Sequence, residues 1–171
     1  MRLAEYTDYT LRVLMYCAAR PQQSVTISEL ADHHGVSRNH LMKIVTDLGR
    51  LGMLATTRGR SGGLRLLMDP AKIRVGDVVR ASETDFRLVE CFDPDTSRCN
   101  LAPSCRLKGL FDAALHAYFK ALDGMTLADL VEPSSAPVSG RPVSLRRRHG
   151  AVPVAMPGGL RRAARTAESD A

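Results

Sequence analysis

Apolar residues that recur at intervals of three and four near the start of the chain predict a helix over residues 7–19. Thr7 or Asp8 is expected to cap its free backbone N–H groups, and Pro21 to stop it. Arg12 lies one turn after Asp8, which is the separation of an ion pair on a helix surface. The apolar face of this helix consists of Leu11, Leu14, Met15 and Ala18.

The next segment has the pattern of two helices joined by a tight turn. One helix begins near Thr26, capped by Thr26 or Ser28, and Gly35 ends it; Ser37 then caps the next. The apolar positions of that next helix are Leu41, Ile44, Val45, Leu48 and Leu51. The pattern predicts a helix-turn-helix, whose second helix enters the major groove of DNA with its N-terminus first.

The leading turn of that second helix is rich in side chains that can read bases. Arg38, Asn39 and His40 occupy it, and Lys43 and Thr46 follow on the outward side. Arginine bonds guanine edges in pairs and asparagine bonds adenine edges in pairs, while phosphate contact is the alternative role for each side chain.

A hairpin is expected next, because residues 53–57 and 64–67 read as short strands around a glycine-rich turn. Such a hairpin is the wing of a winged helix, and Arg60 at its tip can enter a narrow minor groove. No Gly-Lys-Ser/Thr follows the glycines, which argues against a nucleotide-binding loop. The candidate DNA contacts are therefore Ser37, Arg38, Asn39, His40, Lys43, Arg58 and Arg60.

Further along, residues 73–81 read as a short helix that packs on the wing, and residues 126–130 as another. Between them a wide apolar stripe repeats every 3 or 4 residues: Leu107, Leu110, Phe111, Ala114, Leu115, Tyr118, Phe119 and Leu122. So wide a stripe needs a partner surface. A symmetric homodimer is the simplest answer, and packing within the monomer is the alternative.

Charged residues are distributed unevenly along the chain. The whole carries a net charge of +6 over 171 residues, yet residues 133–171 contain 7 arginines and only 2 acidic residues. This proline-rich end is expected to be a disordered basic tail that adds nonspecific DNA affinity. Residues 35–65 hold 6 basic side chains against Asp47 alone. That concentration suits double-stranded DNA, and an ordinary solvated basic face is the alternative.

Taken together, the patterns predict a mainly α fold with a small β-wing, in which a winged helix-turn-helix precedes a long dimerisation helix. Three parts are expected: the DNA-binding domain 1–85, the cysteine loop and dimerisation helix 86–132, and the tail 133–171. The chain has no apolar run of membrane-spanning length and no signal-peptide core at its start. A reducing, cytoplasmic location is therefore expected.

Three of the four cysteines crowd a loop rich in Asp and Pro. Seven residues separate Cys91 from Cys99, and five separate Cys99 from Cys105. Soft thiolates so placed suit an iron-sulfur cluster, or less well zinc, and a fourth ligand must come from elsewhere. Three free thiols are the plainer alternative. Cys17 lies in an apolar helical run and reads as a core residue.

With these pieces in place, the chain resembles the Rrf family of winged-helix iron-sulfur regulators, and most closely its nitric-oxide-sensitive repressors. The matching segments lie between residues 1 and about 132 and read YTDYTLRVLMY, GVSRNHLMKIV, RGRSGGLRL, IRVGDVVR, CX7CX5CRLK and MTLADLVE. The first gap between the cysteines is longer than is usual in that family.

The resemblance implies that Cys91, Cys99 and Cys105 bind a 2Fe-2S or 4Fe-4S cluster. It implies Asp8 of the partner subunit as fourth ligand, with competitors His33, His34 and His116. It further implies a repressor that binds its operator as a homodimer and is released when nitric oxide nitrosylates the cluster. The alternatives are a redox or iron-sulfur-status sensor of the same family, and a zinc-stabilised DNA-binding protein. No catalytic signature accompanies the cysteines, so an enzyme is not expected.

Overall fold

The structure, a computed structural model, describes residues 2–57, 59, 62–93, 95–101 and 104–132. All of these residues belong to one compact unit. The expected tail 133–171 thus falls outside the described residues. The expected boundary between residues 85 and 86 stays a prediction.

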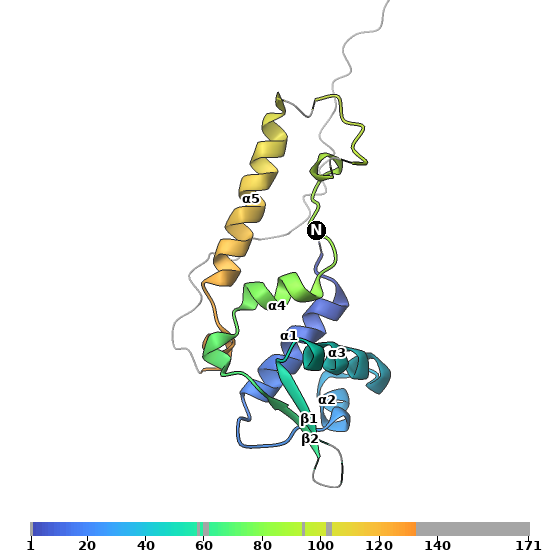
Figure 1. Cartoon of the computed structure of the whole chain (residues 1–171), viewed down its shortest axis with the longest axis vertical. Coiled ribbons are helices and arrows are strands. Elements are labelled where there is room, and N and C mark those ends of the chain that lie inside the picture. The colour runs from blue at the N-terminus through green and yellow to red at the C-terminus, as the bar shows by residue number, and fades with distance from the viewer. Residues whose placement is uncertain (1, 58, 60–61, 94, 102–103, 133–171) are drawn as a thin grey trace, which may run out of the picture. The chain divides into compact units, whose positions relative to one another are not determined.

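Helices α1 (Glu5–Ala18), α2 (Ile27–His34) and α3 (Arg38–Arg50) form the first part of the fold. They lie together with the hairpin in Figure 1, and α3 packs on both α1 and α2. The predicted helix-turn-helix is confirmed in the arrangement of α2 and α3.

The start of α1 differs from the prediction. The helix begins at Glu5, its N-cap is Ala4, and no side chain caps it. Thr7 and Asp8 lie inside the first turns. The Thr7 hydroxyl donates to the carboxylate of Glu83 at 2.9 Å, and Asp8 pairs with Arg12. Both capping candidates are therefore engaged by other partners, one of them distant in the sequence.

Strands β1 (Leu54–Thr57) and β2 (Gly63–Leu66) form the predicted hairpin. They are antiparallel, with Leu54 opposite Leu66 and Thr57 opposite Gly63. The buried Leu54 and Leu64 face the helices, while Arg65 is exposed. A strand that buries one face alternates in this way.

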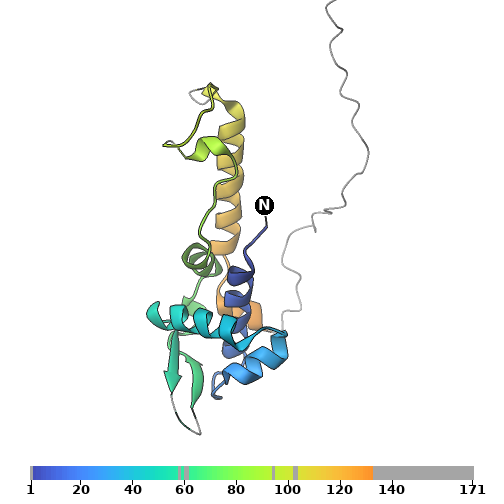
Figure 2. The same cartoon turned by 90° about the vertical axis from the view of Figure 1, so that its right-hand side faces the viewer.

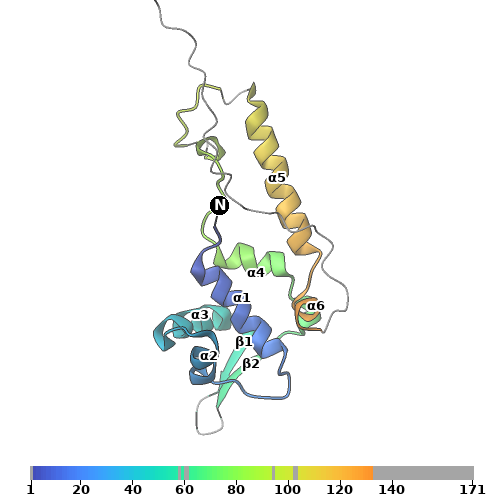
Figure 3. The ribbon, with the colours of Figure 1, turned by 180° about the vertical axis from the view of Figure 1, so that it is seen from behind.

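Helices α4 (Val75–Ser82) and α6 (Leu127–Val131) close the other side of α1, and Figure 3 shows α6 beside it. The segments that lead into these two helices are joined by backbone hydrogen bonds. The N–H of Leu127 donates to the carbonyl oxygen of Ile73 at 2.8 Å, and that of Val75 to the carbonyl oxygen of Met125 at 3.0 Å. The 3-10 turn η1 (Pro70–Lys72) joins the hairpin to α4.

One core joins α1, α2, α3, the hairpin, α4 and α6. Its largest fully buried apolar side chains are Leu14, Leu30, Leu41, Ile44, Leu48, Leu54, Leu127, Val13, Val25, Val78 and Val79. The predicted face of α3 is confirmed at four positions and wrong at Leu51, which is 50% exposed because α3 ends at Arg50. Cys17 is buried in this core, as expected.

Helix α5 (Arg106–Asp123) has 18 residues and appears as a continuous helix in Figure 2. Within the described residues of the chain it has no buried side chain. Leu107 is 55% exposed and Leu110 is 64% exposed. The guanidinium of Arg80 on α4 makes two 2.7 Å hydrogen bonds to Asp123, which fixes the C-terminal end of α5.

Candidate DNA-binding face and cysteine loop

Local capping sets the geometry of the helix-turn-helix. The Thr26 hydroxyl accepts from the backbone N–H of Glu29 at 3.1 Å, and the Glu29 carboxylate accepts from the N–H of Thr26 in return. Gly35 takes a left-handed conformation with φ of 65°, which glycine adopts without steric cost. The Ser37 hydroxyl then accepts from the N–H of His40 at 3.3 Å. These signals make the turn tight and direct the start of α3.

The predicted readers on α3 divide into two groups. Arg38, Asn39 and Lys43 are exposed, as a DNA-contacting face requires. His40 instead lies against α1, with ring centroids 5.6 Å from Tyr9 and 6.5 Å from Tyr6. His40 is thus half-buried against α1, and its role as a DNA contact stays a prediction. Ser37 is exposed and caps the helix.

The hairpin is fixed to the loop before α2. Backbone hydrogen bonds of 3.0 Å and 2.7 Å join Val25 and Leu64 in both directions. A Cβ atom at Gly63 would meet the Ser24 hydroxyl and the Val25 carbonyl, so this contact requires glycine. Arg58 and Arg60, the predicted wing contacts, lie outside the described residues.

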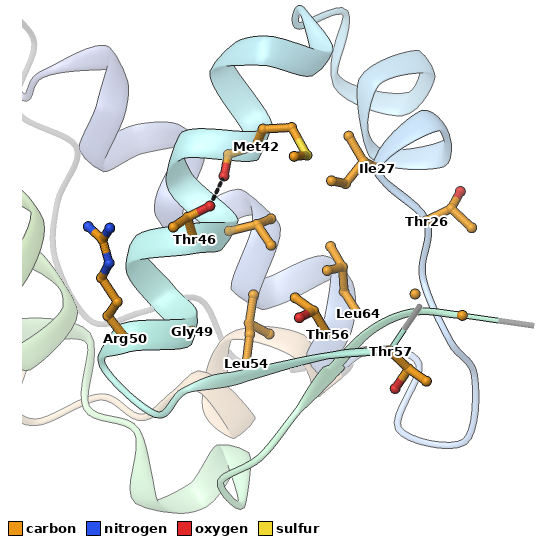
Figure 4. A pocket seen from close by; sticks show the side chains of 13 residues that line it. Thr26, Ile27, Met42, Thr46, Gly49, Arg50, Leu54, Thr56, Thr57 and Leu64 are labelled. Carbon is orange, nitrogen blue, oxygen red and sulfur yellow. Dashed lines mark hydrogen bonds between the residues drawn. The ribbon is translucent and has the colours of Figure 1, made fainter. Parts of the chain in front are cut away.

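A hollow of about 730 Å³ lies beside α3 and the hairpin, where the two elements diverge (Figure 4). Apolar side chains form much of its lining, and threonines and Arg50 stand at its edge. Sequence reasoning missed it, because the lining comes from three separate segments. The residues are Thr26, Ile27, Met42, Val45, Thr46, Gly49, Arg50, Leu54, Thr56, Thr57, Gly62, Gly63 and Leu64.

The three loop cysteines lie in the segment that precedes α5. Cys91 is in the 3-10 turn η2 (Glu90–Phe92), and Cys105 is the N-cap of α5. All three, Cys91, Cys99 and Cys105, are half-buried free thiols. Burial raises the pKa of the fourth thiol, Cys17, to about 11, so this buried cysteine is a poor thiolate donor.

Ion pairs fix the segment around Cys91. The Arg87 guanidinium pairs with Asp85 at 3.0 Å and also with Asp93. The hydrogen bond from Arg87 lowers the pKa of Asp85. The backbone N–H of Arg98 donates to the Glu90 carboxylate at 2.7 Å, which folds the loop back on itself.

Three soft thiols in fifteen residues fit the chemistry of an iron-sulfur cluster. Among the described residues, however, no three His, Cys, Asp or Glu side chains come close enough together to hold one metal ion. The ligand assignment therefore stays a prediction. The three thiols are suitable donors, but the described part of this single chain does not bring them to one point.

The proposed fourth ligand, Asp8, is engaged on its own helix. Its carboxylate pairs with the Arg12 guanidinium at 2.8 Å, and its side chain is 45% exposed. Of the competitors, His34 has its Nε2 buried without a hydrogen-bond partner among the described residues, and burial lowers its pKa. The His33 ring packs 4.7 Å from that of His34, while His116 is exposed on α5.

A helix-turn-helix with an adjoining hairpin and an exposed polar face on its second helix defines a winged-helix transcriptional regulator. The chain belongs to the Rrf2 family: residues 3–133 match the model of that family, described as an iron-dependent transcriptional regulator. The expected family resemblance is confirmed.

Relatives of known name agree with this assignment. The chain is 50% identical over 133 residues to the HTH-type transcriptional regulator NsrR of Bacillus subtilis, a match that covers 77% of this chain and 91% of that protein. It is 46% identical over 132 residues to the NsrR of Bacillus licheniformis, covering 77% and 92%. These relatives are transcriptional regulators and not enzymes, as expected for this chain.

Solved structures share the fold. Staphylococcus aureus CymR in its oxidized form superposes with a TM-score of 0.64 at 23% identity, covering 80% of this chain and 100% of that one. T. potens IscR gives a TM-score of 0.62 at 21% identity, covering 77% and 86%. In the part of the chain that the structure describes, none of the helices has the length and apolar composition needed to cross a membrane.

Proposed function

We propose that this regulator is a nitric-oxide-sensing repressor, which binds operator DNA as a homodimer and is released when its iron-sulfur cluster reacts with nitric oxide. The observation that carries the proposal is the position of α1: it is bonded on one side to α3 and on the other to the segment that leads to the cysteines. The names of the NsrR relatives support the same assignment.

The DNA-binding part of the proposal rests on α3. Its exposed Arg38, Asn39 and Lys43 would enter the major groove, where they can bond base edges or phosphates. Ser37 would donate to a phosphate at the helix start, and Arg58 and Arg60 would contact DNA from the hairpin. His40 would act indirectly, by holding α3 against Tyr6 and Tyr9.

The homodimer is supported by the exposed face of α5. Leu107 and Leu110 would otherwise leave a row of apolar side chains in water, and each buried side chain of this kind contributes about 1.5–3 kcal/mol. Burial against the same face of a second copy satisfies both chains at once, because a two-fold axis pairs identical surfaces. Two reading helices would then address the two halves of a pseudo-palindromic operator.

Cys91, Cys99 and Cys105 would hold the cluster, 2Fe-2S or 4Fe-4S, and Asp8 of the partner subunit would complete it. When bound, the cluster supplies iron that nitric oxide can attack. A carboxylate is a harder and weaker ligand for iron than a thiolate, so Asp8 would be the partner most easily given up. In this chain Arg12 is positioned to take up the Asp8 carboxylate, at 2.8 Å.

The chain's own hydrogen bonds supply a route from Asp8 to the reading helix. Tyr6 lies two residues before Asp8 on the same turn of α1. Its hydroxyl donates to the carboxylate of Asp47 on α3 at 2.6 Å. On the other side, the Glu83 carboxylate accepts from the backbone N–H of Ala4 at 3.0 Å and from Thr7. Any shift of this first turn therefore moves contacts with α3 and with the end of α4 together. Such differential contacts are what a two-state switch requires.

The test compares operator affinity in three forms of the full-length protein prepared without oxygen: as purified, after nitric oxide, and after removal of metal with a chelator. The probe is a duplex that the protein selects from a random-sequence DNA pool, and fluorescence anisotropy gives the dissociation constant. We expect iron and sulfide in the first form and at least a tenfold loss of affinity after nitric oxide. Equal affinity in all three forms would overturn the switch.

A second candidate of the same family, a redox or iron-sulfur-status sensor, is favoured if oxygen or iron depletion causes the loss of affinity and nitric oxide does not. Zinc in place of iron and sulfide would identify a zinc-stabilised DNA-binding protein instead. Metal analysis of the anaerobic protein separates these outcomes before any DNA is added.

A further inference from the structure

Met42 is an apolar side chain on the polar face of the reading helix. It is 51% exposed, although the neighbouring exposed positions on α3 carry Asn39 and Lys43. In Figure 4 its thioether reaches from α3 toward Ile27, over the hollow between α3 and the hairpin. Exposed apolar side chains are common singly, but this one adjoins an apolar hollow in the proposed DNA-binding face.

Met42 also belongs to a row along one side of α3. Residues four apart on a helix lie one above the other, so Arg38, Met42, Thr46 and Arg50 form a continuous line. The Thr46 hydroxyl donates to the carbonyl oxygen of Met42 at 2.7 Å. Its hydrogen is therefore engaged within the helix, so that outward Thr46 can offer its methyl group, or its oxygen as an acceptor, but not a donor. The row has basic ends and an apolar middle.

We propose that Met42 and Thr46 read the 5-methyl group of a thymine in the major groove, with the hollow between α3 and the hairpin receiving that edge of the base. The inference rests on the proposed operator binding and names one determinant of its specificity. Thymine is the base that presents an apolar group in the major groove, and threonine methyl groups are among its usual partners.

The surroundings of the hollow favour DNA as its occupant. It lies between the two elements of a winged helix that contact DNA, so it is continuous with the rest of that face. Val45, Leu54 and Leu64 are among its apolar lining residues. Arg50 stands at its edge in Figure 4 as a partner for a phosphate. A methyl group buried there loses contact with water, whereas uracil, which lacks the methyl group, leaves the Met42 side chain exposed.

The experiment replaces thymines by uracils, one position at a time, in the duplex that the full-length protein selects from a random DNA pool. We expect one thymine in each half-site at which the wild-type protein loses about fourfold in affinity, the equivalent of one buried methyl group. Replacing both gives a loss of about sixteenfold. Met42→Ala should bind the thymine and uracil duplexes equally.

Met68→Ala is the matched control, because Met68 is 40% exposed but does not line the hollow. It should keep the full difference between thymine and uracil. Thermal melting confirms that both variants are folded. The proposal is overturned if no uracil weakens wild-type binding, or if Met42→Ala keeps the difference. This includes the case in which Met42→Ala lowers the affinity for both duplexes by the same factor, since Met42 then contacts the DNA backbone rather than the base.

If the protein enriches no sequence from the pool, the proposed sequence-specific operator binding is wrong, and the thymine contact is wrong with it. Enrichment without any effect of uracil removes the thymine contact alone. If a small apolar molecule occupies the hollow instead, the protein should enrich a sequence whose binding is insensitive to uracil, and that molecule should displace the DNA. This result would also overturn the thymine contact.

Discussion

Tyr6 joins α1 to α3 through one short hydrogen bond to Asp47, and its proton reports on that contact. Burial, and then the hydrogen bond to Asp47, raise the pKa of Tyr6 from 10.0 to about 12. The folded protein therefore keeps this proton at pH values where the unfolded chain has lost it. Its stabilising contribution is complete below pH 10 and is lost as the pH rises through about 12.

Tyr6→Phe should lower the free energy of unfolding at neutral pH by about 1 kcal/mol, because a hydrogen bond to a carboxylate is removed. It should also remove the Tyr6 share of the decline in stability between pH 10 and pH 12. Urea unfolding at a series of pH values measures both effects. Tyr9→Phe, which leaves the bond to Asp47 in place, should keep the decline. Parallel pH profiles for Tyr6→Phe and wild type would contradict this account of Tyr6.

Single residues also show where sequence reasoning succeeds. Thr26, Gly35 and Ser37 act on backbone groups within four residues of themselves, so their roles follow from the sequence. Thr7 was expected to cap α1 but bonds Glu83, 76 residues away, a partner that no local pattern names. The packing of His40 on α1 was not predicted for the same reason, because its neighbours come from another element.

At the scale of elements, α4 and α5 meet at a point that requires glycine. A Cβ atom on Gly76 would overlap the Asp123 carboxylate, which Arg80 holds by two hydrogen bonds of 2.7 Å. The guanidinium of Arg80 also stacks 4.3 Å from the centroid of the Phe119 ring. This contact joins the helix next to α1 to the helix proposed to form the dimer.

Gly76→Ala should therefore lower the free energy of unfolding by about 1–3 kcal/mol, the usual cost of overpacking. Gly49→Ala is the control, since its Cβ would lie 3.8 Å from the nearest neighbouring atom, and alanine should raise stability by up to about 1 kcal/mol. Adding Asp123→Ala removes the overlap, so Gly76→Ala should cost less in that background. Chemical denaturation of the wild type, Gly76→Ala, Asp123→Ala and the double variant completes the double-mutant cycle, and additive effects would refute the contact.

The elements themselves were largely predictable, and the sites between them were not. The helix-turn-helix, hairpin and α5 each follow from a local period of apolar residues. The hollow beside Met42 arises only when α2, α3 and the hairpin are brought together, and its lining residues share no sequence pattern. The donor set of the cysteine loop was evident from spacing, whereas its geometry depends on contacts that spacing does not specify.

At the scale of the whole molecule, α5 should determine whether two chains associate. Leu110→Asp places a charge in the exposed apolar row and should give monomers at concentrations where the wild type is dimeric. Asp112→Lys changes the charge two residues further on, which is the opposite side of α5 from Leu110, and should leave the dimer intact. Sedimentation equilibrium measures both, and a dimer in both variants would assign the interface elsewhere.

Asp8 and Arg12 offer a test of the shared metal centre, because they form one ion pair but have different proposed roles. An exposed pair of this kind contributes about 0–1 kcal/mol, so Asp8→Ala and Arg12→Ala should change stability equally little. Only Asp8→Ala removes a ligand proposed for the cluster of the partner subunit. It should therefore alter the visible absorption of the anaerobic protein and speed its loss of iron, while Arg12→Ala leaves the spectrum unchanged. Identical spectra for the two variants would limit Asp8 to its contact with Arg12, and the fourth ligand would then be sought among His33, His34 and His116.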